Sequence, residues 1–432
     1  MFALTFILSL LVFSLVLWVN PWTQGLSKRT FIATWILKCF AGLLLLFVYT
    51  SMYPKRSEAD VFKYFDDGKT LSKIAHSNPR AFYHIIVGSW DKQQLPQLNQ
   101  LNYWFRAYDH GIANDNRMVI RFNAILNLFT QGNYALNLMF FLGLSWLGCY
   151  WLFQFFHHLS ASKVSALFCA FLIPSTMFWS SGILKEALLM FAIGGFLFAS
   201  LRVYTRLNWH YLFLLIPCLL MLMFLKVYVL VLMLPWLLLG WIWHRWKSIP
   251  SVIGAAIGLL LIGILINVFL FPSLNALSTL QGKQFDFIQM AKAVHAGSII
   301  AIKPLDGTWW NCILAAPFGF WNALAYPNIF MINNLQSMAA FIENTLILIV
   351  LFGSVCQLCF YRGAMTWHFP LLGFSMLMFM LIGMTTPVVG AIVRYKAPAL
   401  PFFLLALLNY QPPFINRFFS SIPLNKWLNT HL

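Results

Sequence analysis

The chain has 432 residues, of which 61% are hydrophobic, 18% are aromatic and only 9% are charged. Soluble domains carry charge on about a quarter of their residues, so this composition excludes an ordinary soluble domain, and the ample apolar surface excludes a disordered chain. The 28 Lys and Arg residues outnumber the 11 Asp and Glu residues and give a net charge of +17. They are scattered between apolar runs, which favours membrane loops, phosphate ligands and membrane lipids over nucleic acid as partners.

Apolar stretches predict the transmembrane helices. A helix needs about 20 apolar residues to cross a bilayer. Eleven stretches reach or approach this length: 2–19, 31–50, 133–156, 164–180, 183–201, 209–225, 227–243, 250–271, 338–360, 367–386 and 397–410. The first lacks the positive n-region of a signal peptide, so we expect a retained span. We predict an all-α polytopic membrane protein with about 11 transmembrane helices, in a range of about 10 to 13, forming a single integral membrane domain over 1–432.

Two long polar segments interrupt the apolar series, at 51–116 and 272–336. Both are expected to carry amphipathic helices. The stretch 117–130 combines an apolar stripe with Arg117, Arg121 and two asparagines. This pattern predicts an interfacial or re-entrant helix.

The Lys and Arg residues of the short loops predict the orientation, because cytoplasmic loops are enriched in them. One set of helix ends carries ten: Lys28, Arg29, Lys163, Arg202, Arg206, Arg245, Lys247, Arg362, Arg417 and Lys426. The opposite set carries four: Lys185, Lys226, Arg394 and Lys396. This asymmetry predicts that the N-terminus lies outside, the C-terminus inside, and both long polar segments on the outer face.

All eleven acidic residues then fall on the predicted outer side. Nine belong to the long polar segments: Glu58, Asp60, Asp66, Asp67, Asp91, Asp109, Asp115, Asp286 and Asp306. The other two, Glu186 and Glu343, lie near the outer ends of spans. A carboxylate that acts as a base, an acid or a metal ligand must therefore act at the outer surface, although short inner loops with few polar residues would give the same distribution.

The segment after the second span contains the first candidate site. Apolar residues recur there at near-helical spacing: Val61, Phe65, Leu71 and Ile74. Asp60, Tyr64 and Asp67 fall together on another face of the same helix, so Tyr64 and Asp67 are candidates to bind the substrate beside Asp60. A helix on the outer surface would hold Asp60 just above the lipid headgroups, where a lipid-linked substrate presents its polar end. The alternative is an amphipathic connector whose acids face water.

The stretch from Pro174 to Glu186 joins two spans with almost no linker and places Lys185 and Glu186 at the membrane rim. Adjacent residues on a helix do not face one another, so each needs a partner elsewhere. Lys185 suits a phosphate as a point charge, and Glu186 could orient it or bind a sugar hydroxyl. The alternative is a snorkelling lysine that ends a span beneath an aromatic belt.

The third candidate is the entrance of the last span, where Arg394 and Lys396 lie on the predicted outer side against the positive-inside trend. An arginine fork that binds a phosphate or pyrophosphate would explain this placement. Tyr395 is available to stack on a sugar or an isoprenoid. Pro398 and Pro401 break the start of the span and free backbone groups there.

Other signals for chemistry are weaker. The aromatic residues of the second long segment, including Trp309 and Trp310, suit either sugar binding or a membrane interface. No histidine has zinc-ligand spacing to a second ligand, and no Gly-rich phosphate loop occurs, so neither a metal site nor an ATP-driven pump is predicted. We predict no cofactor, and the sequence leaves the participation of a divalent metal open.

These three candidate stretches resemble bacterial multi-span glycosyltransferases of the GT-C type. Asp60-Val-Phe-Lys-Tyr64 is similar to an acidic early-loop motif, Pro174 to Glu186 to a Pro-Ser to Lys-Glu stretch, and Arg394 to Pro401 to a late Arg-Tyr element. The resemblance implies a bacterial inner (cytoplasmic) membrane protein, Asp60 as the general base of an inverting transfer, and a polyprenyl-phosphate-linked sugar as donor. Two features depart from the family: two apolar runs precede Asp60, and the second long segment has no comparable acidic motif.

The expected function is sugar transfer at the outer face to a glycan or lipid-linked acceptor. Asp60 would take the acceptor proton, while Arg394, Lys396 and Lys185 neutralise the departing lipid phosphate. Two alternatives stay open. A lipid-linked oligosaccharide polymerase or ligase of the O-antigen type would use outer-loop arginines: Arg80, Arg106, Arg117 and Arg121. A transporter or flippase of a lipid-linked or anionic substrate would bury ionisable residues at mid-bilayer, for which the candidates are Lys38 and Glu343.

Overall fold

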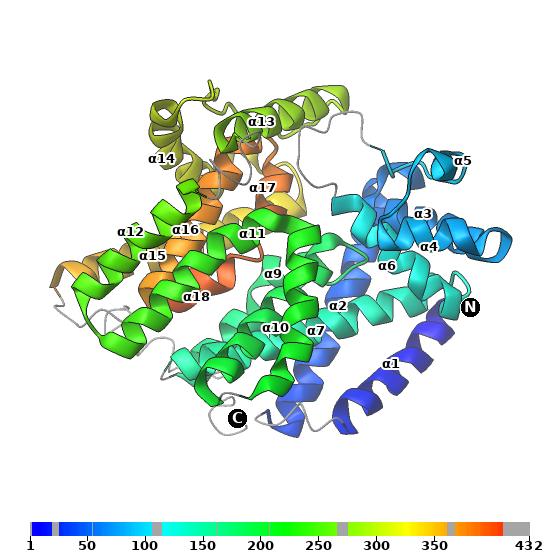
Figure 1. Ribbon diagram of the computed structural model, residues 1–432, viewed down its shortest axis with the longest axis horizontal. Coiled ribbons are helices and arrows are strands. Elements are labelled where there is room, and N and C mark those ends of the chain that lie inside the picture. The colour runs from blue at the N-terminus through cyan, green and yellow to red at the C-terminus, as the bar shows by residue number, and fades with distance from the viewer. Residues whose placement is uncertain are drawn as a thin grey trace.

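The computed structural model describes residues 2–19, 26–53, 55–105, 115–160, 162–206, 208–265, 275–360 and 368–408. These residues form helices that pack side by side, as Figure 1 shows. No strand occurs within the described ranges, in which Ile299 and Val388 form an isolated antiparallel bridge. The predicted all-α class is confirmed.

The α-helices are labelled as in Figure 1. In chain order they are α1 (Phe2–Val19), α2 (Lys28–Met52), α3 (Asp60–Ser77), α4 (Pro79–Val87), α5 (Leu95–Leu98), α6 (Asp115–Thr130), α7 (Tyr134–Leu159), α8 (Lys163–Leu167), α9 (Pro174–Trp179), α10 (Lys185–Arg206), α11 (Leu212–Trp246), α12 (Ile249–Leu265), α13 (Ala276–Ala293), α14 (Trp309–Ala325), α15 (Leu335–Phe360), α16 (His368–Thr385), α17 (Val389–Lys396) and α18 (Leu400–Leu408).

Several helices are suited to a membrane. Five segments of the described chain are long and apolar enough to cross one: Lys28–Met52, Tyr134–Leu159, Lys185–Thr205, Trp209–Trp246 and Leu335–Gln357. The pair α17 and α18, bent by 65°, raises the number to six if it forms one span. The helices indicate a membrane-embedded protein, but the predicted eleven spans are not confirmed.

Two of the predicted apolar stretches lie at breaks in the helices. The stretch 164–180 is divided between α8 and α9 by a π-helical turn. The stretches 209–225 and 227–243 together form α11, in which Lys226 leaves the helical conformation with φ −151° and ψ 80°. The stretch 164–180 is therefore not one straight helix, whereas the predicted division between 225 and 227 lies at the break in α11.

Glycines permit the closest helix crossings. A Cβ on Gly194 of α10 would overlap the backbone oxygen of Gly148 on α7, and a Cβ on Gly383 of α16 would overlap the backbone oxygen of Gly319 on α14. Membrane helices associate largely through van der Waals contact between closely spaced backbones. These two glycine pairs therefore fix the α7–α10 and α14–α16 interfaces.

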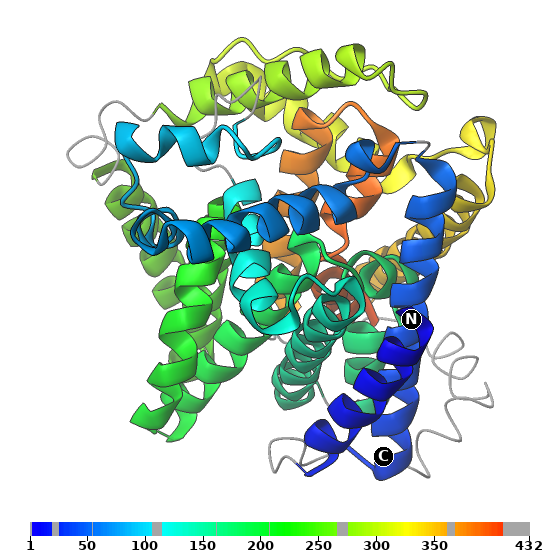
Figure 2. The same cartoon turned by 90° about the vertical axis from the view of Figure 1, so that its right-hand side faces the viewer.

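The described helices α3 and α13, from the two long polar segments, form a layer at one end of the bundle, where they lie across the longer helices (Figure 2). Beneath α3 lies α6, the predicted amphipathic helix, and a Cβ on Gly68 would lie 2.5 Å from the Cβ of Asn123. The Nδ2 of Asn137 on α7 donates to Oδ1 of Asn123 and of Asn127, at 3.1 and 3.0 Å. The polar residues of α6 thus face a buried amide network that anchors the layer to α7.

Candidate functional site

Four separate parts of the chain meet beneath the polar layer. They are the start of α3, the start of α10, the break in α11 and the last turn of α17. They contribute Asp60, Glu186, Lys226 and Arg394, whose side chains contact one another in a chain of ion pairs. We call these four residues the Arg394 cluster.

Arg394 is the centre of the cluster. Its Nη1 donates a hydrogen bond to Oδ2 of Asp60 at 2.7 Å, and its Nη2 donates to Oε2 of Glu186 at 2.9 Å. The side chain of Glu186 is 1% exposed and that of Arg394 is 10% exposed, whereas that of Asp60 is 33% exposed. Asp60 therefore lies at the accessible edge of the cluster, and Glu186 lies at its buried end.

Lys226 gives Glu186 a second cation. Its Nζ lies 3.2 Å from Oε1 of Glu186, and the residue is only 5% exposed. The non-helical backbone at Lys226 places a cation from the middle of α11 opposite the first turn of α10. The same Nζ lies 4.6 Å from the centre of the Tyr395 ring, so the aromatic face adds a cation–π contact.

Two further lysines surround the carboxylates. The Nζ of Lys63 lies 3.6 Å from Oδ1 of Asp60. Lys185 is close enough to interact electrostatically with both Asp60 and Glu186, and its Nζ lies 5.7 Å from the centre of the Tyr64 ring. With Arg394 and Lys226, four cations therefore surround two carboxylates. Such an excess of positive charge favours an anionic ligand.

The electrostatic environment of Asp60 controls its strength as a base. Burial favours a higher pKa for this carboxyl, but the charges of Arg394, Lys63 and Lys185 and the hydrogen bond from Arg394 together outweigh burial and lower the pKa. The carboxylate is therefore ionised at neutral pH and is a weak base while Arg394 is paired with it. Withdrawal of Arg394 would make Asp60 a stronger base.

Arg394 also carries an unused hydrogen-bond donor. Its Nε is buried and has no hydrogen-bond partner among the described residues. Buried N–H groups in native proteins are nearly always paired with protein, water or ligand. An oxyanion bound beside Asp60 would supply the missing acceptor.

Tyr395 connects the second polar segment to the cluster. Its ring packs on Phe287 of α13, with the ring centres 5.9 Å apart. The guanidinium carbon of Arg394 lies 5.8 Å from the centre of the ring of Trp179, the last residue of α9. Aromatic side chains from three parts of the chain therefore border the charged groups, and Tyr395 is already engaged with protein on part of its surface.

The structure separates Asp67, which was predicted to bind substrate, from Asp60, the predicted base. Asp67 is 1% exposed, and its two carboxylate oxygens accept the backbone N–H groups of Asn102 and Tyr103, at 3.0 and 2.8 Å. Residues seven apart on a helix share a face but lie about 10 Å apart along it. Asp67 therefore holds the segment after α5 against α3, which is a correction to its predicted substrate-binding role.

Tyr64 and Lys396 also differ in their surroundings from the prediction. Tyr64 is buried beside Lys185, and its hydroxyl donates to Oδ1 of Asn116 at 3.2 Å. Lys396 is 0% exposed, and its Nζ donates to a backbone oxygen of α14 at 2.7 Å and to Oδ1 of Asn344 at 2.6 Å. Positions 394 and 396 point to different sides of a helix, so Lys396 ties α17 to α14 and α15 and does not join the Arg394 cluster.

The predicted stretch from Pro174 to Glu186 is held by contacts at several points. Glu343 accepts hydrogen bonds from the backbone N–H of Ser175 at 2.7 Å and from its hydroxyl at 2.5 Å. Lys38 is 0% exposed and donates to Oγ of Ser180 at 2.6 Å, so it pairs inside the bundle and does not snorkel. These contacts fix the segment that leads into Lys185 and Glu186.

Two residues of the site were absent from the predicted set. Lys226 could have been predicted from the sequence, because it is a cation on the predicted outer side between two apolar stretches. A cation in that position is as unusual as Arg394 is in its own. Lys63 carried no signal that distinguishes it from the other charges of α3. Its role follows only from its distance to Asp60.

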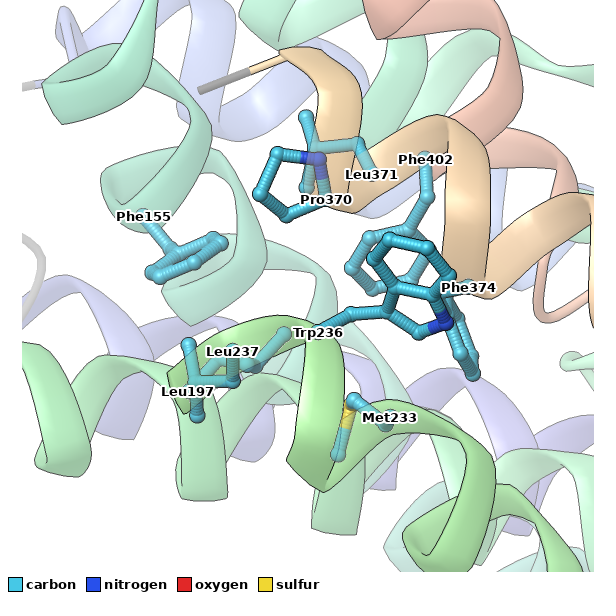
Figure 3. Close-up of a pocket in the computed structure, with 9 residues that line it drawn as sticks. All are labelled: Phe155, Leu197, Met233, Trp236, Leu237, Pro370, Leu371, Phe374 and Phe402. Atoms are coloured by element: carbon cyan, nitrogen blue, oxygen red, sulfur yellow. The ribbon is translucent and has the colours of Figure 1, made fainter. Parts of the chain in front are cut away.

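An apolar cavity lies elsewhere, between α7, α10, α11, α16 and α18 (Figure 3). Its volume is about 20 Å³ and its lining side chains are hydrophobic. A space of this size holds about one water molecule. It is therefore a gap in the packing of the bundle and not a substrate site.

Comparison with protein-family models, with curated proteins and with solved structures gives no match for this chain. The described residues contain no group of three or more His, Cys, Asp or Glu side chains placed to hold a metal ion. The function is therefore argued from the Arg394 cluster.

Proposed function

We propose that the protein transfers a sugar from a polyprenyl-phosphate donor to a hydroxyl of a glycan or lipid-linked acceptor. The observation that carries the proposal is the bridge from Asp60 through Arg394 to Glu186, at the end of apolar helices and with more cations than carboxylates around it. A base, a cation for the lipid phosphate and a path to the bilayer are the parts that this reaction requires.

The donor phosphate would enter the cluster by competing with Asp60 for Arg394. A phosphate offers more acceptor oxygens than one carboxylate and can also use the buried Nε of Arg394. Lys63 and Lys185 stabilise the added negative charge from the side of Asp60. Asp60 then loses the partner that lowers its pKa and becomes a stronger base.

In the transfer step, the acceptor hydroxyl gives its proton to Asp60 while its oxygen forms a bond to the anomeric carbon of the sugar. The bond from this carbon to the phosphate oxygen breaks, and the electron pair stays on the departing lipid phosphate. The displacement inverts the anomeric configuration. A positioned base contributes a rate factor of about 10²–10⁴, and Arg394 and Lys185 stabilise the charge that develops on the phosphate.

We place this chemistry at the outer face of a bacterial inner membrane. Arg394, Lys226 and Lys185 share one end of the bundle with α3 and α13, and most short-loop Lys and Arg residues belong to the opposite ends. Because cytoplasmic loops are the basic ones, this arrangement supports an outward-facing cluster, an N-terminus outside and a C-terminus inside.

The arginines that a polymerase or ligase would use give this alternative less support. Arg117 and Arg121 donate from Nε to backbone oxygens of neighbouring segments, at 3.2 and 2.8 Å. They therefore serve to hold the polar layer together. Arg80 is exposed, and Arg106 lies outside the described residues.

The fully buried Lys38 and Lys396 are the observation that favours a second candidate, a flippase of lipid-linked substrates. Transporters place ionisable groups inside the bundle. A flippase would move the intact donor between leaflets without releasing polyprenyl phosphate. Release of polyprenyl phosphate therefore distinguishes a transferase from a flippase.

The test is the release of polyprenyl phosphate from a panel of polyprenyl-phosphate sugars by the protein in nanodiscs, with glycan and lipid-linked acceptors. Asp60→Asn should lower the rate by about 10²-fold or more, while polyprenyl phosphate binds as well as in the wild type or more tightly. Asp66→Asn is the matched control, because Asp66 pairs with Arg56 at 2.8 Å on the exposed side of α3. Full activity in Asp60→Asn would overturn the assignment of the base. Movement of intact donor without phosphate release would support the flippase.

A further inference from the structure

A polar hollow of about 470 Å³ lies between α7 and α10. Its lining residues are Gln154, His157, His158, Phe198, Leu201, Arg202 and Thr205. Tyr134, at the start of α7, packs on Phe62 of α3 with the ring centres 5.4 Å apart, and the last turn of α7 lies about 35 Å further along the helix. The hollow is therefore at the opposite end of the bundle from the Arg394 cluster.

The residues of the hollow are cationic or neutral, and none of them is acidic. His157 and His158 are exposed in the last turn of α7. Two further basic groups come from other helices: Lys163 of α8 interacts electrostatically with His157, and His244 of α11 interacts with His158. Arg202 and the two histidines line the hollow, and two more basic groups lie close to the histidines, which favours an anion there.

Arg202 is the best-placed donor of the hollow. Its guanidinium carbon lies 4.9 Å from the centre of the Phe198 ring, and this cation–π contact restricts the guanidinium to one face of the hollow. Its Nε is buried and has no hydrogen-bond partner among the described residues. A buried charged donor without an acceptor is costly, so a ligand that brings an oxyanion would satisfy it.

We infer that this hollow binds a phosphate group, with Arg202 as the principal donor and His157 and His158 beside it. A guanidinium suits this ligand because its planar donors match phosphate oxygens. The group would come either from the headgroup of an anionic phospholipid at the membrane surface or from a free phosphate. The site is independent of the proposed sugar transfer, since it shares no residue with the Arg394 cluster.

The experiment measures phosphate binding to the full-length protein in two arms. In one, inorganic phosphate is titrated into the detergent-solubilised protein by calorimetry. In the other, the protein is placed in nanodiscs of phosphatidylcholine with or without phosphatidic acid, and retained lipid is counted by native mass spectrometry. Arg202→Gln should weaken binding by about tenfold or more, and His158→Gln, an exposed change that the fold should tolerate, should weaken it by a smaller factor.

Arg245→Gln is the matched control, because Arg245 is an exposed arginine at the same end that does not line the hollow. Retained phosphatidic acid that is lost in Arg202→Gln and kept in Arg245→Gln identifies a lipid headgroup, and saturable inorganic phosphate with the same pattern identifies a free phosphate. Absence of binding in both arms, or equal loss in Arg245→Gln, would overturn the inference. If Arg202→Gln does not fold, unchanged binding in His158→Gln overturns it as well.

Discussion

Arg394 and Asp60 form a hydrogen-bonded ion pair of 2.7 Å across 334 positions of the sequence. The pair joins α17 to the first residue of α3, so it links the bundle to the polar layer. It also places the proposed base and the proposed phosphate ligand in direct contact. In the absence of donor, the base is therefore held in its weak form.

Arg394→Lys tests the fork geometry. Lysine keeps the charge but lacks the planar donors that would bind Glu186 and the phosphate at the same time. We expect the Kd for polyprenyl phosphate to rise by about tenfold or more, measured with the protein in nanodiscs. Arg56→Lys is the control, because Arg56 makes a similar two-point contact with Asp66 on the surface. Equal effects of the two changes would contradict the role of Arg394.

A comparison of Lys226→Met with Lys396→Met distinguishes a residue of the binding site from a residue that only stabilises the fold. Removal of Lys226 takes a cation from Glu186 and should weaken polyprenyl phosphate binding by about threefold to tenfold. Removal of Lys396 leaves Oδ1 of Asn344 without its buried donor. It should lower the free energy of unfolding by about 1–3 kcal/mol without changing the Kd of the folded fraction. A weaker Kd in Lys396→Met, with an unchanged Kd in Lys226→Met, would show that Lys396 belongs to the binding site.

Gly68→Ala tests the crossing of α3 over α6. The added Cβ would lie 2.5 Å from the Cβ of Asn123 and 3.1 Å from backbone atoms of α6. Overpacking of this kind costs about 1–3 kcal/mol, so the unfolding temperature should fall. Gly254→Ala in α12, where nothing lies within 4 Å of the new Cβ, should leave it unchanged or raise it. A tolerated Gly68→Ala would mean that the two helices lie further apart than described.

Asp67 should give the polar layer a pH dependence. Burial raises the pKa of this carboxyl to about 6 and outweighs the N–H donors of Tyr103 and Asn102, from an ordinary value of 3.8. Between these two values the folded protein binds more protons than the unfolded chain, so its stability falls as the pH rises through this window and levels off above it.

The measurement is the free energy of unfolding of the wild type relative to Asp67→Asn between about pH 4 and pH 7. The difference should decline up to about pH 6 and then stay constant. An increase with pH over the same range would show that Asp67 is stabilised as the anion instead.

Part of the site could be predicted from the sequence because membrane chains carry so few charges. Asp60 stood out as an acidic residue that follows an apolar run, and Glu186 and Arg394 stood out as ionisable residues at the ends of apolar runs. Their convergence depends on helix packing over hundreds of residues, so only the structure brings them together. The all-α class followed from composition alone.

Other features depend on local geometry that residue patterns do not encode. Lys396 shares a short motif with Arg394, yet the rotation of the helix turns it to another interface. Asp67 repeats the position of Asp60 on α3, yet the segment after α5 folds back and occupies its carboxylate. The stretch 164–180 is apolar in sequence, yet a π-helical turn divides it between α8 and α9.

The central claim is that the donor phosphate replaces Asp60 on Arg394. The most direct measurement is an electron cryomicroscopy structure of the protein in nanodiscs with polyprenyl phosphate. We predict that the phosphate lies within hydrogen-bond distance of the Arg394 guanidinium, with the Asp60 carboxylate displaced from it and facing the space above. A phosphate bound elsewhere, with the 2.7 Å contact between Arg394 and Asp60 intact, would contradict the account.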